Sequence, residues 1–216
     1  MLNQLKEFSK MEFKSERKEV AKFMRRLYKQ RLTTSSGGNI SIKNSDGFIF
    51  ITASQTDKSI IKYEQIIVFN SDGENLTTEL KPSMEFNMHL QIYKARPDIY
   101  AIVHAHPVYA STFAVTDKKL DSSLTGEARF VLGKIEIINY ELMGTLALAE
   151  ACTESLKKSN VAIMNNHGAI CLGQSLFQAF DRMEVLEFTS NIYFNTLLLN
   201  DCKRLNDSEL KEIDEI

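Results

Sequence analysis

The stretch Tyr100-Ala-Ile-Val-His-Ala-His-Pro107 joins an apolar, β-branched run to two histidines, His104 and His106. Such runs favour a buried strand. Alternate residues of a strand point to the same face, so both imidazoles project to one side with their Cα atoms roughly 7 Å apart. Pro107 has no backbone N–H and ends the strand, at an edge where a ligand could enter. The stretch therefore predicts a strand that carries two side chains suited to one metal ion.

A third histidine occurs in a similar setting. The run Val161-Ala-Ile-Met-Asn-Asn-His167 is again apolar before its polar end, and the glycine that follows allows the backbone to turn. Three imidazoles that leave one position open are typical of a catalytic rather than a structural zinc site. Histidines at strand ends also bond to carbonyl groups or fill polar notches, and His167 alone would favour that interpretation. His104, His106 and His167 together favour the metal site.

Length and composition limit the class of protein. A chain of 216 residues is within reach of one α/β domain, so we expect a single domain over 1–216. The net charge of −2, without a Lys/Arg cluster, argues against a nucleic-acid partner. There is no apolar run of about 18 residues, which argues against a membrane span. The three cysteines form no CxxC motif and fit reduced thiols, so we expect a cytoplasmic protein.

Hydrophobic periodicity and turn residues predict the order of elements. We expect helices over residues 3–31, 84–95, 108–115, 142–157 and 175–199, and a short acidic helix at the end of the chain. Ser83 is suited to the N-cap of the second helix. We expect strands over residues 40–43, 48–52, 66–69, 100–106 and 136–139, and another before His167. The turn Asn44-Ser-Asp-Gly47 predicts that the first two strands form a hairpin. The pattern indicates early hairpins, later βα units and helices on both faces of the sheet.

Three further features could contribute to a site. Glu85 begins a helix, where a carboxylate is either a surface charge stabilised by the helix dipole or a base or ligand near the histidines. The spacing leaves both open. His89 lies on the same helix face, and we expect it to pack or to face solvent, because three other histidines complete a set. The segment 35–39, Ser-Ser-Gly-Gly-Asn, could cradle a phosphate with its N–H groups or be an ordinary helix-to-strand connection.

Five short motifs follow one another along about 130 residues of the sequence. They are Gly38-Asn39-Ile-Ser, Ile51-Thr52, Lys81-Pro-Ser-x-Glu85, Val103-His-x-His-Pro and Asn166-His-Gly. Together they resemble the class II aldolase/adducin family over essentially the whole chain, and within it the fuculose-1-phosphate aldolases. The resemblance implies an α/β/α sandwich with a central, mainly antiparallel sheet flanked by helices. It also implies a homotetramer with active sites at subunit interfaces.

The resemblance also assigns roles to residues. It implies that His104, His106 and His167 bind one Zn²⁺ per chain, although another divalent metal could replace zinc. Glu85 would be the catalytic acid/base and an additional metal ligand. The partner would be a small sugar phosphate, and the residues implied to hold its phosphate are Ser36, Gly38, Asn39, Ser54 and Ser83.

The implied reaction is cleavage of a small ketose phosphate to dihydroxyacetone phosphate and an aldehyde through a metal-stabilised enediolate. The alternatives are a sugar-phosphate dehydratase or 4-epimerase on the same metal site, or a non-catalytic, adducin-like binding module. The epimerases carry aspartate where this chain has Glu85, which favours an aldolase or a dehydratase. The intact set of metal ligands favours catalysis over a binding module.

The chain departs from the aldolase pattern at three positions. Met84 replaces the second of two serines, Gln55 replaces a glycine of the second phosphate loop, and Thr125 lies near the place of a proton-donating tyrosine. Tyr109 and Tyr140 could supply the proton instead. No geometric reason favours either of them, and both are otherwise expected to be core residues.

Overall fold

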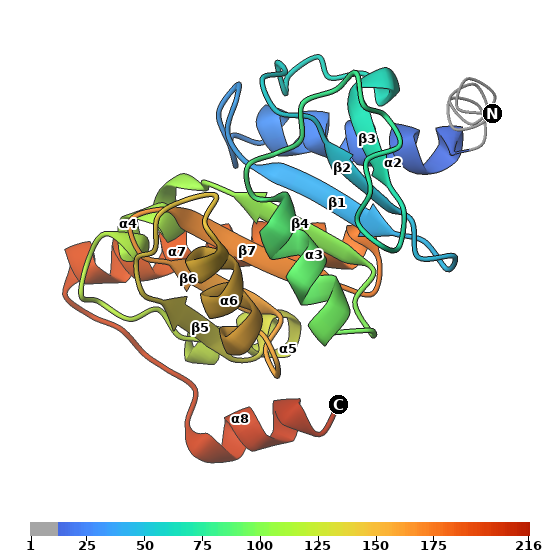
Figure 1. Ribbon diagram of the computed structural model, residues 1–216. Helices are drawn as coiled ribbons and strands as arrows, with labels where there is room; N and C mark the ends of the chain where they lie inside the picture. The colour runs from blue at the N-terminus through green and yellow to red at the C-terminus, as the bar shows by residue number, and fades with distance from the viewer. Residues whose placement is uncertain (1–12) are drawn as a thin grey trace.

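A computed structural model describes residues 13–216 and shows a seven-stranded sheet between two layers of helices (Figure 1). The first predicted helix begins within residues 1–12, which lie outside the described residues. No helix within 13–216 is long and apolar enough to cross a membrane. The described helices are α2 (Lys14–Lys29), α3 (Phe86–Ala95), α4 (Val108–Ala114), α5 (Gly126–Leu132), α6 (Leu146–Ser155), α7 (Leu176–Leu199) and α8 (Asp207–Asp214). The strands are β1 (Asn39–Lys43), β2 (Ile49–Thr52), β3 (Ile66–Phe69), β4 (Ala101–Ala105), β5 (Ile135–Ile138), β6 (Val161–Met164) and β7 (Gly168–Gly173).

The strands lie in the order β3-β2-β1-β4-β7-β6-β5. Neighbouring strands are antiparallel except β5 and β6, which are parallel. The predicted hairpin between β1 and β2 is present, and the Asn44 N–H donates to the carbonyl of Phe48 at 3.0 Å. The expectation of a mainly antiparallel sheet flanked by helices is confirmed.

The two faces of the sheet carry separate apolar clusters. Helices α2, α4, α5 and α7 pack on one face, whereas α3 and α6 pack on the other and lie in front of the sheet in Figure 1. Side chains of β4 alternate between the faces, so Val103 joins the first cluster and Ile102 joins the second. By the same alternation His104 lies on the face of α3 and α6. This face carries the candidate site.

One strand and one α-helix of the structure were not predicted. β7 pairs with β4 on one side and β6 on the other, so it lies near the middle of the sheet. Its sequence, Gly-Ala-Ile-Cys-Leu-Gly, has glycine at both ends and only four apolar residues between them, which gives a weak strand signal. α5 is a short helix of seven residues, too brief for its periodicity to stand out.

Two predicted helix starts were wrong by a few residues. α6 begins at Leu146 rather than 142 because the Thr145 hydroxyl accepts a hydrogen bond from the Leu148 N–H at 3.3 Å, which caps the helix there. α3 begins at Phe86, and Glu85 rather than Ser83 occupies the N-cap position. The Ser83 hydroxyl instead accepts from the Glu85 N–H at 3.3 Å, so it holds the turn that leads into the helix.

Candidate metal centre

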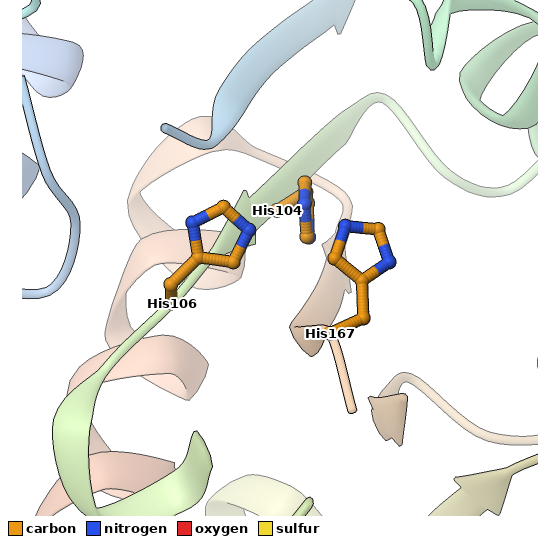
Figure 2. Close-up of side chains that lie close together, drawn as sticks. All are labelled: His104, His106 and His167. Atoms are coloured by element: carbon orange, nitrogen blue, oxygen red, sulfur yellow. The ribbon is translucent and has the colours of Figure 1, made fainter. Parts of the chain in front are cut away.

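Three histidines from separate parts of the chain converge at one edge of the sheet. His104 is in β4, His106 follows this strand, and His167 lies in the turn between β6 and β7. One nitrogen from each ring lies within 4.8 Å of one nitrogen from each of the others. Figure 2 shows the ring of His104 seen edge-on between the rings of His106 and His167. The structure therefore brings together the three residues predicted to bind metal.

Close approach of the backbones makes this convergence possible. Gly168 begins β7 beside the end of β4. A Cβ at this position would lie 2.5 Å from the carbonyl oxygen of Ala105 and 2.6 Å from Cδ2 of His106. Asn166, two residues earlier, has a φ of 55°, the left-handed conformation that asparagine tolerates better than most residues. The Asn-His-Gly sequence thus provides both the tight turn and the space that the ring of His106 occupies.

The protonation of His104 follows from its hydrogen bond. Its Nδ1–H donates to the carbonyl of Ala169 at 2.9 Å, so its other nitrogen, Nε2, carries a lone pair. Nε2 is buried without a hydrogen-bond partner and lies 3.3 Å from the carboxylate Oε2 of Glu85. Two atoms that both carry lone pairs repel each other at this distance unless a cation or proton lies near them. A buried, unpartnered nitrogen that faces a carboxylate fits a metal ligand.

The charge states of these groups suit metal binding. Burial lowers the pKa of His104, and burial together with the neighbouring histidines lowers the pKa of His106 to about 3, so both rings are neutral. Burial alone would raise the pKa of Glu85, but interactions with His104 and His167 and a hydrogen bond from Asn39 lower it overall. Neutral imidazoles and an ionised carboxylate are the forms that coordinate zinc and similar divalent ions.

A buried chain of hydrogen bonds supports the Glu85 carboxylate. Asn39 Nδ2 donates to Glu85 Oε2 at 2.7 Å, and His89 Nε2 lies 2.5 Å from Asn39 Oδ1. His89 Nδ1 is 2.7 Å from the Ser41 hydroxyl, which is 2.8 Å from the Tyr93 hydroxyl. His89 was expected to pack or to face solvent. It is fully buried and links α3 to β1, a role that its position on the helix did not indicate.

A pocket of about 400 Å³ opens beside the histidines. Its volume lies in the usual range for small-molecule sites. Besides Glu85, His106 and His167, its lining includes all five residues predicted to hold a phosphate, Ser36, Gly38, Asn39, Ser54 and Ser83. Lys58, Met143 and Asn166 also line it and were not predicted. No sequence motif distinguishes Lys58 from an ordinary surface lysine.

The departures from the aldolase pattern differ in their structural effect. Gln55 has a φ of 57°, so the loop keeps the left-handed turn that glycine adopts most easily. Thr125 caps α5 by accepting from the Ala128 N–H at 3.1 Å. Neither Tyr109 nor Tyr140 lines the pocket, and Tyr140 is 57% exposed, so the expectation that it is a core residue was wrong. The pocket lining within the described residues contains no tyrosine.

Comparison with known proteins agrees with this geometry. Residues 18–194 match the family model of the Class II Aldolase and Adducin N-terminal domain. The chain belongs to this family. An L-fuculose phosphate aldolase from Methanococcus vannielii is 39% identical over 170 residues, which cover 79% of this chain and 91% of that relative. A 5-deoxy-D-ribulose 1-phosphate aldolase from Bacillus thuringiensis serovar kurstaki is 33% identical and covers 94% of this chain and 95% of its own.

Solved structures of class II aldolases resemble the structure of this chain. An L-fuculose 1-phosphate aldolase structure superposes with a TM-score of 0.86 at 31% identity, covering 93% of this chain and 94% of that one. The family also includes other chemistry, because a relative from Haemophilus influenzae named 3-oxo-tetronate 4-phosphate decarboxylase is 29% identical over 88% of this chain and 91% of its own. This class II aldolase family member is an enzyme of the aldolase type. Class II aldolases depend on a metal ion, and this chain has a group of three histidines that could hold one.

Proposed function

We propose that this protein is a zinc-dependent aldolase that cleaves a small ketose 1-phosphate, similar to fuculose 1-phosphate, to dihydroxyacetone phosphate and an aldehyde. The names of the relatives support an aldolase that acts on a sugar phosphate. The observation that carries the proposal is the unpartnered Nε2 of His104, which faces Glu85 beside the pocket. Three histidines, one carboxylate and several hydroxyl groups lie together at the described site, which supports metal binding, proton transfer and binding of an anion.

His104, His106 and His167 would hold the metal, and Glu85 is close enough to His104 and His167 to act as a further ligand. A bound zinc ion supplies Lewis acidity, which stabilises the negative charge that develops on the substrate oxygen during carbon–carbon bond cleavage. The neutral state of His104 and His106 leaves their lone pairs available for this role.

Glu85 would transfer the proton to and from C3 of the substrate. It is the one carboxylate among the described residues that line the pocket, and it is ionised. In the synthetic direction an ionised Glu85 removes a proton from C3 of dihydroxyacetone phosphate. In the cleavage direction a base accepts the proton of the C4 hydroxyl, the C3–C4 bond breaks with its electron pair on C3, and C4 becomes the aldehyde carbon. Glu85 would take up a proton from solvent and pass it to C3, so the proton lost at C4 and the proton gained at C3 balance. Asn39 holds the carboxylate toward the pocket.

The test is metal analysis of the purified protein combined with cleavage assays on a panel of ketose 1-phosphates. We expect about one zinc per chain and release of dihydroxyacetone phosphate that stops after chelation. His106→Ala should lose both the metal and turnover, whereas Glu150→Gln, which alters an exposed residue outside the pocket, should keep both. Retained zinc and full activity in His106→Ala would refute the proposal.

The products separate the rival reactions. Only an aldolase releases an aldehyde together with a three-carbon ketone phosphate, because decarboxylation of a 3-oxo-tetronate 4-phosphate leaves the same ketone phosphate with carbon dioxide instead. Release of carbon dioxide would indicate the decarboxylation named for the Haemophilus influenzae relative. Loss of water or inversion at C4 would indicate a dehydratase or an epimerase. A protein with no metal and no turnover would be a binding module.

We also propose the domain organisation, the oligomeric state and the cellular location of this enzyme. We place the whole chain, 1–216, in one domain and propose a homotetramer with active sites at subunit contacts. A subunit contact would also bring further side chains to a pocket whose described lining has no tyrosine. The three free thiols support a cytoplasmic location. Light scattering during size-exclusion chromatography tests the tetramer, which would appear at about four times the mass of one chain.

A further inference from the structure

Lys58 places a buried ammonium group in the wall of the pocket. The residue is 2% exposed and lines the pocket together with Ser36 and Ser54. Its backbone N–H donates to the carbonyl of Ser35 at 2.8 Å, which holds its loop against the segment that leads to Gly38. Lysine is rarely buried without a partner of opposite charge. The position therefore needs an explanation.

The described chain offers Lys58 no such partner. Its Nζ donates to the carbonyl of Ala53 at 2.7 Å and to the Thr56 hydroxyl at 3.0 Å, both of them neutral groups. None of the ion pairs within residues 13–216 includes Lys58. The neighbouring Asp57 is bonded to the backbone and side chain of Ser59 instead. An ammonium group has three donors, so one donor of Lys58 has no partner in the described chain.

We propose that Lys58 is a specificity-determining residue whose ammonium group pairs with the phosphate dianion of the substrate. A buried cation without a counter-charge is unfavourable, and an anion bound beside it relieves this cost. The hydroxyl groups of Ser36, Ser54 and Ser83 line the same pocket and can donate to the remaining phosphate oxygens. The inference rests on the proposed function, because it identifies the anion as the phosphate of a sugar phosphate.

The lining of the pocket then combines two kinds of chemistry. The histidines and Glu85 form one part of the lining, while Lys58 sits with the loop residues Ser36 and Ser54. A ketose 1-phosphate, which carries a phosphate next to its carbonyl group, satisfies both. An unphosphorylated sugar would leave the Lys58 ammonium unpaired.

The pKa of Lys58 supports this assignment. Burial lowers it to about 8, so the cation outweighs the neutral form by only about tenfold at pH 7 in the free pocket. A bound dianion favours the protonated form, so phosphate binding and protonation of Lys58 are linked. Affinity for phosphate should therefore decrease as the pH rises above about 8, because the lysine is then neutral before the anion binds. The phosphate itself stays a dianion over this range.

The experiment measures binding of inorganic phosphate to the metal-loaded, full-length protein by calorimetry, with no turnover required. Lys58→Met removes the charge and keeps most of the side-chain volume. We expect phosphate affinity to decrease by about tenfold or more, the usual effect of losing a charged hydrogen bond. Lys58→Arg keeps a cation and should bind phosphate more tightly than Lys58→Met, without the decrease above about pH 8. Lys62→Met, an exposed lysine next to the same loop, is the matched control and should bind like wild type.

Thermal unfolding with and without phosphate provides a second measurement, since a ligand that binds the folded state raises the unfolding temperature. Phosphate should stabilise wild type and the Lys62→Met control but not Lys58→Met. If Lys58→Met keeps wild-type phosphate affinity and the wild-type KM for the ketose phosphate, Lys58 is only structural and the inference is wrong. If phosphate binding depends on Lys58 but no ketose phosphate is cleaved, the proposed function fails while the anion site stands.

Discussion

Replacing His89 with phenylalanine should destabilise this protein by an amount that depends on pH. His89 is fully buried between α3 and β1, where its two ring nitrogens face the Asn39 amide oxygen and the Ser41 hydroxyl. The Glu85 carboxylate only accepts hydrogen bonds, so Asn39 must donate its NH₂ to Glu85 and accept from His89. His89 Nε2 therefore carries the proton, and Nδ1 accepts from Ser41.

The two hydrogen bonds of His89 set the size of the destabilisation near neutral pH. Phenylalanine keeps the ring but removes both of these hydrogen bonds, which leaves the Asn39 oxygen buried without a partner and the Ser41 hydroxyl with Tyr93 as its remaining partner. A buried polar group that loses its partner costs about 1–3 kcal/mol, so two groups cost roughly 4 kcal/mol in free energy of unfolding. For a protein of this size the melting temperature should decrease by about 10 °C.

The pH dependence follows from the pKa of His89. Burial, the largest effect, lowers it from 6.5 to about 3, with Glu85 opposing the shift and His104 adding to it. Between these two values the unfolded chain binds a proton that the folded chain excludes, so wild-type stability decreases as the pH falls through this window. At about pH 5 the loss is roughly 2 kcal/mol, since each pH unit below 6.5 is worth about 1.4 kcal/mol. His89→Phe lacks this contribution.

The assay is urea unfolding at about pH 7.5 and about pH 5, with a chelator present so that metal binding does not change with pH. The difference between wild type and His89→Phe should shrink from roughly 4 to roughly 2 kcal/mol. Tyr93→Phe, at the far end of the same chain, removes one hydroxyl and no titrating group in this range. It should cost about 1 kcal/mol at both pH values. An equal cost for His89→Phe at both pH values would refute the neutral, hydrogen-bonded assignment of His89.

Two further predictions follow from packing and from thiol chemistry. Gly168→Ala should lower both the melting temperature and the metal content, because its Cβ would collide with the β4 backbone and the His106 ring. Gly126→Ala is the control, since a Cβ at Gly126 meets only Ile213, at 3.7 Å. A thiol reagent should label Cys202 alone in the native protein and all three cysteines in urea, since burial raises the pKa of Cys152 to about 12 and raises that of Cys171 further, while Cys202 is exposed. Rapid native labelling of a second thiol would contradict the buried assignment.

The sequence predicted the parts of the fold that local patterns encode. Most strands and long helices follow from alternation and helical periodicity, and the hairpin follows from the turn residues 44–47. β7 was missed because its position in the sheet, not its own composition, makes it a strand. It pairs with β4 and β6, both strongly apolar, and backbone hydrogen bonds to such neighbours stabilise a segment that would be a poor strand alone.

The residues of the candidate site likewise fall into those that local sequence patterns could predict and those that they could not. The three histidines could be predicted to meet because each follows an apolar run, and residues at strand ends gather at sheet edges. Lys58 could not be predicted, because its burial depends on the contact of its loop with Ser35 and Ala53. The partners of His89 depend on the packing of α3 over β1, which no local pattern specifies.

The strand spacing in β1 and the helical spacing in α3, taken together, nevertheless indicate the chain of hydrogen bonds that supports Glu85. In β1, Asn39 and Ser41 are two residues apart, so both face α3 while Ile40 faces the opposite cluster. From the start of α3, Glu85, His89 and Tyr93 are four residues apart and share one face. Two polar residues at strand spacing thus lie opposite three at helical spacing. A slip of one residue in the register between β1 and β4, where Asn39 pairs with His104, would turn Asn39 away from Glu85. The register of the sheet therefore helps to set the direction of the Glu85 carboxylate.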